Sequence, residues 1–171
     1  FDHHKITAEV LSAILGGCSS SRLFYEIRDL RGLSYDIAAG HLAYSDTGVF
    51  TIQTAFKTKN MKKGLKIIID EIEKISSQKV SEKELSDVKE MIKGTAAIAR
   101  EQTNYVANRL AIDYLFEQKV VSPKEYNEQI DEVSADDVLK VAQMIFKKEN
   151  FNLQIVGPFK DVEPFQKILS H

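Results

Sequence analysis

Residues 11–35 read LSAILGGCSSSRLFYEIRDLRGLSY, and the chain changes direction within this stretch. The segment 6–15 has apolar side chains at helical spacing, which predicts a helix. Gly16 and Gly17 follow it, and glycine is typical of a helix end because it adopts backbone angles that other residues avoid. The stretch therefore predicts a first helix that stops at the paired glycines.

A second helix is expected to start within the serines and to run as far as Gly32. Ser19 or Ser20 can cap it, because a serine oxygen accepts hydrogen bonds from the free amides of a first turn. The helix is expected to present one apolar face, which carries Leu23, Ile27 and Leu30. The chain would then turn back at Gly32 into a segment of a different period.

That next segment alternates apolar and polar residues, which is typical of β-strands. Two such segments cover residues 33–44 and 49–57, and the turn sequence SDTG at 45–48 joins them. One face of the first strand is expected to carry Tyr35, Ile37, Ala39 and His41. One face of the second is expected to carry Phe50, Ile52, Thr54 and Phe56. We predict an antiparallel hairpin of two long strands.

A run of helices is expected to fill most of the remaining chain. Residues 60–75, 81–100 and 103–117 have apolar side chains at helical spacing, including Val106, Leu110 and Tyr114 in the third segment. The sequences at 81–84 and 122–125 have the pattern of capping boxes, and the sequence at 134–137 opens a further helix. Residues 151–155 alternate and predict a late strand, and 160–171 predict a short helix.

These elements predict an α+β fold with an antiparallel sheet and a layer of several helices. Strands do not alternate singly with helices, which argues against a doubly wound parallel fold. The length of 171 residues suits one domain with a hydrophobic core, which we place over residues 1–171. Because the chain begins with Phe1 and not with methionine, we expect it to be part of a longer protein.

Composition limits the kinds of function. A formal net charge of −2 argues against a chain built to bind nucleic acid, which needs clustered positive charge. No apolar run approaches the ~20 residues that span a membrane. Cys18 is the only cysteine, so no internal disulfide forms, and a reducing compartment, the cytoplasm, is expected.

Three kinds of chemistry find little support in the motifs. The glycine-rich phosphate-binding patterns G-x-x-x-x-G-K-S/T and G-x-G-x-x-G are both absent from the sequence. Cys18 lies near a helix start, which favours a thiolate, but sequence places no histidine beside it as a base. The four histidines, His3, His4, His41 and His171, form neither H-E-x-x-H nor H-x-x-E-H. We therefore predict no metal site and no catalytic residue within this chain.

Arg28 and Tyr35 remain as candidates for a binding site. The turn at Gly32 can bring the two side chains to one rim, and both donate hydrogen bonds. Two donors that converge on a backbone carbonyl would orient a peptide and stabilise a developing oxyanion. Spacing alone leaves a second interpretation open, in which Arg28 forms a surface ion pair and Tyr35 is a half-buried strand residue.

The stretch at 11–35 resembles a family motif, L-x-x-x-L-G-G-x-x-S-S-R-L-F-x-x-I-R-x-x-x-G-L-x-Y. This motif belongs to the pitrilysin/mitochondrial processing peptidase family of zinc peptidases, the inverzincins. The resemblance continues through the turn at 45–48, the helical run, the phrase VSADDV at 133–138 and the closing VGP at 156–158. It covers nearly the whole chain.

The resemblance implies the substrate-binding, C-terminal domain that carries no zinc in a metalloendopeptidase. Arg28 and Tyr35 match the arginine and tyrosine that bind the substrate backbone, and Gly16, Gly17, Ser19 and Ser20 match a possible substrate loop. Zinc would lie in the partner domain, in the same or a paired chain, and a dimer is possible. The family's domain opens with a strand, which we expect to be missing before Phe1.

Two other functions remain compatible with the same residues. Some members of the family have lost catalysis and serve as scaffold or regulatory subunits. A stand-alone peptide-binding module is the third possibility. The presence or absence of H-x-x-E-H in an adjoining domain distinguishes the first two functions, and the absence of any partner chain would favour the third.

Overall fold

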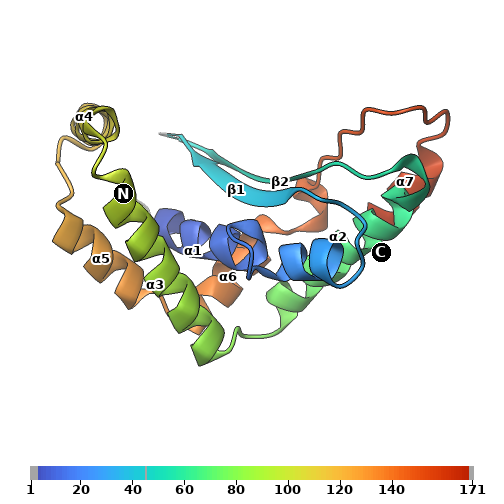
Figure 1. Ribbon diagram of the computed structural model, residues 1–171, viewed down its shortest axis with the longest axis horizontal. Coiled ribbons are helices and arrows are strands. Elements are labelled where there is room, and N and C mark those ends of the chain that lie inside the picture. The colour runs from blue at the N-terminus through green and yellow to red at the C-terminus, as the bar shows by residue number, and fades with distance from the viewer. Residues whose placement is uncertain (1–3, 45, 170–171) are drawn as a thin grey trace.

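A computed structural model describes residues 4–44 and 46–169, apart from the side chain of residue 117. Figure 1 shows a two-stranded sheet lying across a group of helices. The elements in chain order are α1 (His4–Gly16), η1 (Phe24–Asp29), β1 (Ile37–Ala43), β2 (Gly48–Thr54), η2 (Thr58–Asn60), α2 (Met61–Ser77), α3 (Glu82–Ala99), α4 (Thr103–Ile112), η3 (Asp113–Glu117), α5 (Pro123–Glu132), α6 (Ala135–Ile145), η4 (Lys148–Asn150) and α7 (Glu163–Leu169). The predicted α+β class is confirmed.

The hairpin has the predicted antiparallel pairing, with Ile37 opposite Thr54 and Ala43 opposite Gly48. Its strands are shorter than the predicted segments, and Tyr35 precedes β1, which corrects its place as a strand residue. The Tyr44 amide donates to the carbonyl of Thr47 at 2.8 Å and closes the hairpin. Residue 45 of the predicted turn lies outside the described residues.

The core forms where α1 meets β1, α3 and α6. Val10, Leu11 and Leu15 of α1 are fully buried, because the helix passes between the sheet and the other helices. The end of α1 approaches β1 so closely that a side chain on Gly16 would lie 2.4 Å from the backbone nitrogen of Ala39. Helix α1 thus fixes the position of the hairpin.

The second helix differs from the prediction at both ends. It starts at Arg22, and neither Ser19 nor Ser20 caps it: the Ser20 hydroxyl contacts the Cys18 sulfur at 3.1 Å. Its middle is a π-helix, in which the Leu30 amide donates to the carbonyl of Tyr25. This wider turn shifts the helical phase. Leu30 is therefore 55% exposed instead of buried beside Leu23 and Ile27, whereas the end at Gly32 is confirmed by its φ of 56°.

The capping box predicted at 122–125 forms in full, the one predicted at 81–84 forms in part, and the helix predicted to open at 134–137 is present. Full capping boxes form at Ser122 and Ser134, at the starts of α5 and α6. At the start of α3 the Ser81 hydroxyl accepts from the amide of Glu84, as predicted. The Glu84 carboxylate does not complete that box, because it forms two 2.7 Å hydrogen bonds with Arg22.

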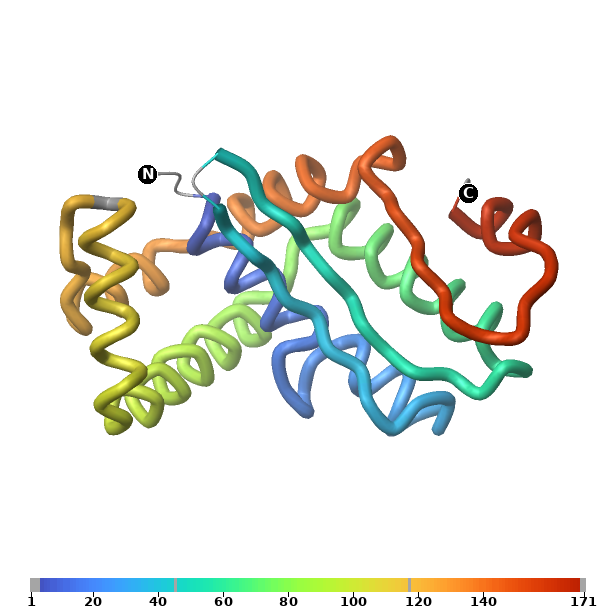
Figure 2. The backbone as a smooth tube through the Cα atoms, turned by 90° about the horizontal axis from the view of Figure 1, so that it is seen from above, coloured from blue at the N-terminus to red at the C-terminus, as the bar shows by residue number. Residues whose placement is uncertain are grey.

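One further prediction is wrong. Residues 151–156 are extended but form no strand, since β1 and β2 are the only paired strands among the described residues. Figure 2 shows this stretch running in the same general direction as β2 without joining the sheet. The helix predicted at 103–117 is present as α4 and η3. Helix α4 has no buried residue, and Leu110 is 43% exposed.

The predicted C-terminal helix is present as α7. No helix within the described residues is both long and apolar enough to cross a membrane.

Candidate functional site

Arg28 and Tyr35 are positioned by a turn that the surrounding hydrogen bonds hold in place. Arg28 lies in the last turn of η1. The Leu33 amide then donates to the carbonyl of Ile27 at 2.8 Å and folds the chain back. Beside Tyr35, the Ser34 hydroxyl donates to the carbonyl of Asp36 at 2.7 Å. The turn therefore has a defined geometry even though the tyrosine ring is on the surface.

The structure brings the two predicted side chains into contact. The guanidinium carbon of Arg28 lies 4.2 Å from the centre of the Tyr35 ring and 4.5 Å from the centre of the Phe24 ring. Such cation–π contacts stabilise an exposed pair by about 0.5–1 kcal/mol each. Both rings lie against the guanidinium, and its N–H groups donate to no other described residue, so they stay available to a ligand.

Within the part of the chain that the structure describes, neither donor group has a hydrogen-bond or ion-pair partner. Among the described residues, Arg28 forms no ion pair, which excludes the surface ion pair considered from the sequence. The Tyr35 side chain is on the surface as well, since the residue is 80% exposed. The arrangement can therefore offer a permanent cation and a neutral hydroxyl to one acceptor group.

Both residues line one hollow of about 570 Å³, which we call the Arg28 hollow. Its lining comes from the end of η1, the turn and the end of β2: Arg28, Asp29, Gly32, Leu33, Ser34, Tyr35, Ala55 and Lys57. Lys57 was missed by the sequence reasoning. The hairpin register indicates its place, because continuing the pairing beyond Ile37 and Thr54 brings Lys57 opposite Ser34.

The residues of the possible substrate loop lie elsewhere. Gly16, Gly17, Ser19 and Ser20 do not line the Arg28 hollow. The two glycines have a packing role, because a side chain on Gly17 would lie 2.6 Å from the Cα of Ala13. Their part in substrate handling stays a prediction.

The described residues do not fit a metal ion. No group of three or more histidine, cysteine, aspartate and glutamate side chains comes together among them. His41 lies on β1, where burial lowers its pKa, and His4 begins α1. His3 and His171 lie outside the described residues.

A comparison with protein-family models decides the family. Residues 2–92, more than half of the chain, match the model of the peptidase M16 inactive domain. The chain belongs to the peptidase M16 family. The resemblance drawn from residues 11–35 is thereby confirmed.

Relatives of this M16 domain are consistent with that assignment. A Rickettsia felis protein named "Uncharacterized zinc protease" is 33% identical over 150 residues, which are 88% of this chain and 36% of the relative. A conserved protein from Enterococcus faecalis is 26% identical with a TM-score of 0.72, over 83% of this chain and 33% of that structure. The chain thus spans about a third of the length of such relatives.

One solved structure resembles the isolated domain. It is the inactive peptidase domain of a putative zinc protease from Bordetella parapertussis, with a TM-score of 0.68 and 15% identity. The match covers 84% of this chain and 78% of that one, and at this identity it shows the fold alone.

Proposed function

We propose that this M16 inactive domain binds an extended peptide and positions it for cleavage by a zinc ion that another domain holds. One observation carries the proposal: Arg28 and Tyr35 meet over one hollow, and neither donor group is bound by a described acidic side chain. A peptide backbone offers the acceptor carbonyls that such a pair of donors suits.

The chain's own part in this function is to hold and orient the peptide. Arg28 donates from a guanidinium that two rings hold in place, and the Tyr35 hydroxyl can donate to the same carbonyl. Donors fixed in advance stabilise the negative charge that develops on a carbonyl oxygen during attack. The attacking group would come from the zinc-binding domain, and no metal-binding cluster forms among the described residues of this chain.

We further propose that the zinc-binding domain is the partner of this chain and that it covers η3, which follows α4. Relatives about three times longer leave room for such a domain. Helix α4 stands at one end of the molecule in Figure 1 and has no buried residue of its own. In η3, Leu115 is 67% exposed and Phe116 is 62% exposed. Such an exposed apolar surface is typical of a site that another domain or protein covers.

The proposal is tested by peptide hydrolysis in the protein that joins this chain to its zinc-binding domain. Arg28→Ala removes the cation. Loss of one oxyanion donor costs about 10²–10³ in kcat, and we expect a value near the lower end because the site is open to solvent. Arg31→Ala is the matched control, since Arg31 is a neighbouring arginine bound to Glu26 instead of to the hollow.

Equal kcat/KM values for the wild type, Arg28→Ala and Arg31→Ala would contradict the proposed role. A joined protein that binds zinc but hydrolyses no peptide would instead indicate a scaffold or regulatory subunit.

A further inference from the structure

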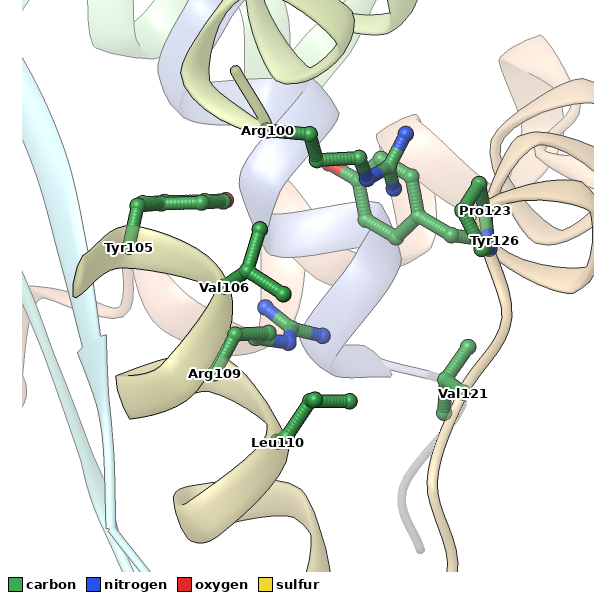
Figure 3. A pocket seen from close by; sticks show the side chains of 8 residues that line it. All are labelled: Arg100, Tyr105, Val106, Arg109, Leu110, Val121, Pro123 and Tyr126. Atoms are coloured by element: carbon green, nitrogen blue, oxygen red, sulfur yellow. The ribbon is translucent and has the colours of Figure 1, made fainter. Parts of the chain in front are cut away.

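A second hollow lies where the end of α3, the helix α4 and the start of α5 meet (Figure 3). We call it the Arg100 hollow, and its volume is about 210 Å³. Its lining residues are Arg100, Tyr105, Val106, Arg109, Leu110, Val121, Pro123 and Tyr126. None of them lines the Arg28 hollow, so the two sites are separate.

Most of the wall is apolar. Val106 and Leu110 project from successive turns of α4 (Figure 3). Val121, before α5, and Pro123, the first residue of α5, face them. Ligand pockets usually combine such walls with a few polar groups, and they measure about 300–1,000 Å³ for drug-sized ligands. The Arg100 hollow is smaller, so it suits a small apolar group.

Two guanidinium groups supply the polar part, and they are not equivalent. Nε of Arg109 lies 3.0 Å from a carboxylate oxygen of Asp113, whose side chain is 1% exposed. Arg109 is therefore committed to a buried acid. Arg100 is half-buried and lies 5.2 Å from the centre of the Tyr126 ring, and it forms no ion pair with any described residue.

The other acid near this hollow is engaged as well. The Tyr126 hydroxyl donates to Glu9 at 2.5 Å. Burial, with the nearby Glu9 charge, raises the pKa of Tyr126, so the hydroxyl keeps its proton and the hydrogen bond. Arg100 and Arg109 balance the charges of Glu9 and Asp113. However, Glu9 already accepts from Tyr126, and Asp113 already pairs with Arg109. Arg100 is the one cation here that still lacks an anionic partner among the described residues.

We propose that the Arg100 hollow binds a carboxylate that carries a small apolar group, such as the last residue of a peptide with an aliphatic side chain. A guanidinium can bind a carboxylate through two parallel hydrogen bonds. Arg100 takes the carboxylate, and the apolar group packs against Val106 and Leu110. The site goes beyond the proposed function, because it recognises a chain end and not an internal peptide carbonyl.

Isothermal titration calorimetry of the 171-residue chain tests this site, since a related inactive domain exists as a separate structure. N-acetyl-leucine should bind with a Kd of about 10 mM or lower. N-acetyl-leucinamide, which lacks the charge, should bind at least about tenfold more weakly. Arg100→Gln should weaken the binding of N-acetyl-leucine by about 10- to 100-fold. Arg31→Gln should leave this binding unchanged, because Arg31 does not line the Arg100 hollow.

A second variant keeps the proposal falsifiable if Arg100→Gln does not fold. Val106→Phe fills the hollow from the surface of α4, and it should abolish binding while circular dichroism stays unchanged. The proposal is overturned if wild type binds no N-acetyl-leucine, if the amide binds equally well, or if both variants bind like the wild type.

The source of the carboxylate is distinguished by one more ligand. The probe 4-methylpentanoate has the same side-chain shape without the peptide group. Tighter binding of N-acetyl-leucine would identify a peptide terminus, and equal binding would identify a small organic acid; either result supports the shared chemistry.

Discussion

Replacing Gly16 with alanine tests how α1 and the hairpin are held together. Sequence reasoning assigns Gly16 to a helix end with backbone angles that other residues avoid, but among the described glycines only Gly32 has a positive φ. The structure gives a different reason for glycine at this position: the Cβ of an alanine would lie 2.4 Å from the nitrogen and 2.8 Å from the Cβ of Ala39. Backbone cannot rotate away as a flexible side chain can, so α1 and β1 must separate.

The expected cost follows from two opposing effects. Overpacking a tight contact costs about 1–3 kcal/mol. Alanine in place of glycine in a helix recovers about 0.5–1 kcal/mol. We therefore expect a net loss of about 1–2 kcal/mol in the free energy of unfolding. For a chain of this size, that loss lowers the melting temperature by about 2–8 °C.

Urea denaturation followed by circular dichroism measures the effect, with Gly94→Ala as the control. Gly94 lies within α3, and a Cβ there meets no atom within 4 Å. The control should therefore gain about 0.5–1 kcal/mol. Stabilisation of both variants by a similar amount would refute the packing argument for Gly16.

Three further predictions concern charge and exposed surface. The raised pKa of Tyr126 contributes stability that is present below the ordinary tyrosine pKa of about 10 and is lost as pH rises above it, so Tyr126→Phe should abolish one step of alkaline destabilisation in urea titrations from pH 8 to 12. Glu84→Gln should cost about 1–2 kcal/mol in the same denaturation assay at pH 7, because it breaks the two-bond pair with Arg22, which is partly exposed; a loss under 0.3 kcal/mol would contradict this. The isolated chain should self-associate in sedimentation experiments, and the double substitution Leu115→Ser with Phe116→Ser should reduce association without lowering stability.

The features predicted from the sequence are those that neighbouring residues determine. Ser122 and Ser134 cap their helices because the acceptor and donor lie three residues apart. The hairpin follows from alternation around a short turn, and its register is set locally. Arg28 and Tyr35 meet for the same reason, since one turn at Gly32 separates them.

The features that sequence reasoning missed depend on distant residues or on small changes of helical phase. Alternation at 151–155 indicates strand propensity, but a strand also needs a partner, and the described sheet ends at β2. Glu84 has the spacing of a capping box, yet Arg22, 62 residues away, binds it. Leu30 is exposed because a π-turn adds one residue to the helical repeat, which a period of 3.6 does not anticipate.

The central claim is that this domain holds a peptide through Arg28 and Tyr35, and Tyr35→Phe tests it most directly. The substitution removes one hydroxyl and keeps the ring that contacts Arg28. Tyr44→Phe is the matched control, because Tyr44 is also exposed but lies at the far end of β1. In the protein joined to its zinc-binding domain, we predict that Tyr35→Phe lowers kcat/KM for peptide hydrolysis by about 10- to 100-fold, and that Tyr44→Phe leaves it unchanged. Equal kcat/KM values for the two variants would contradict the account.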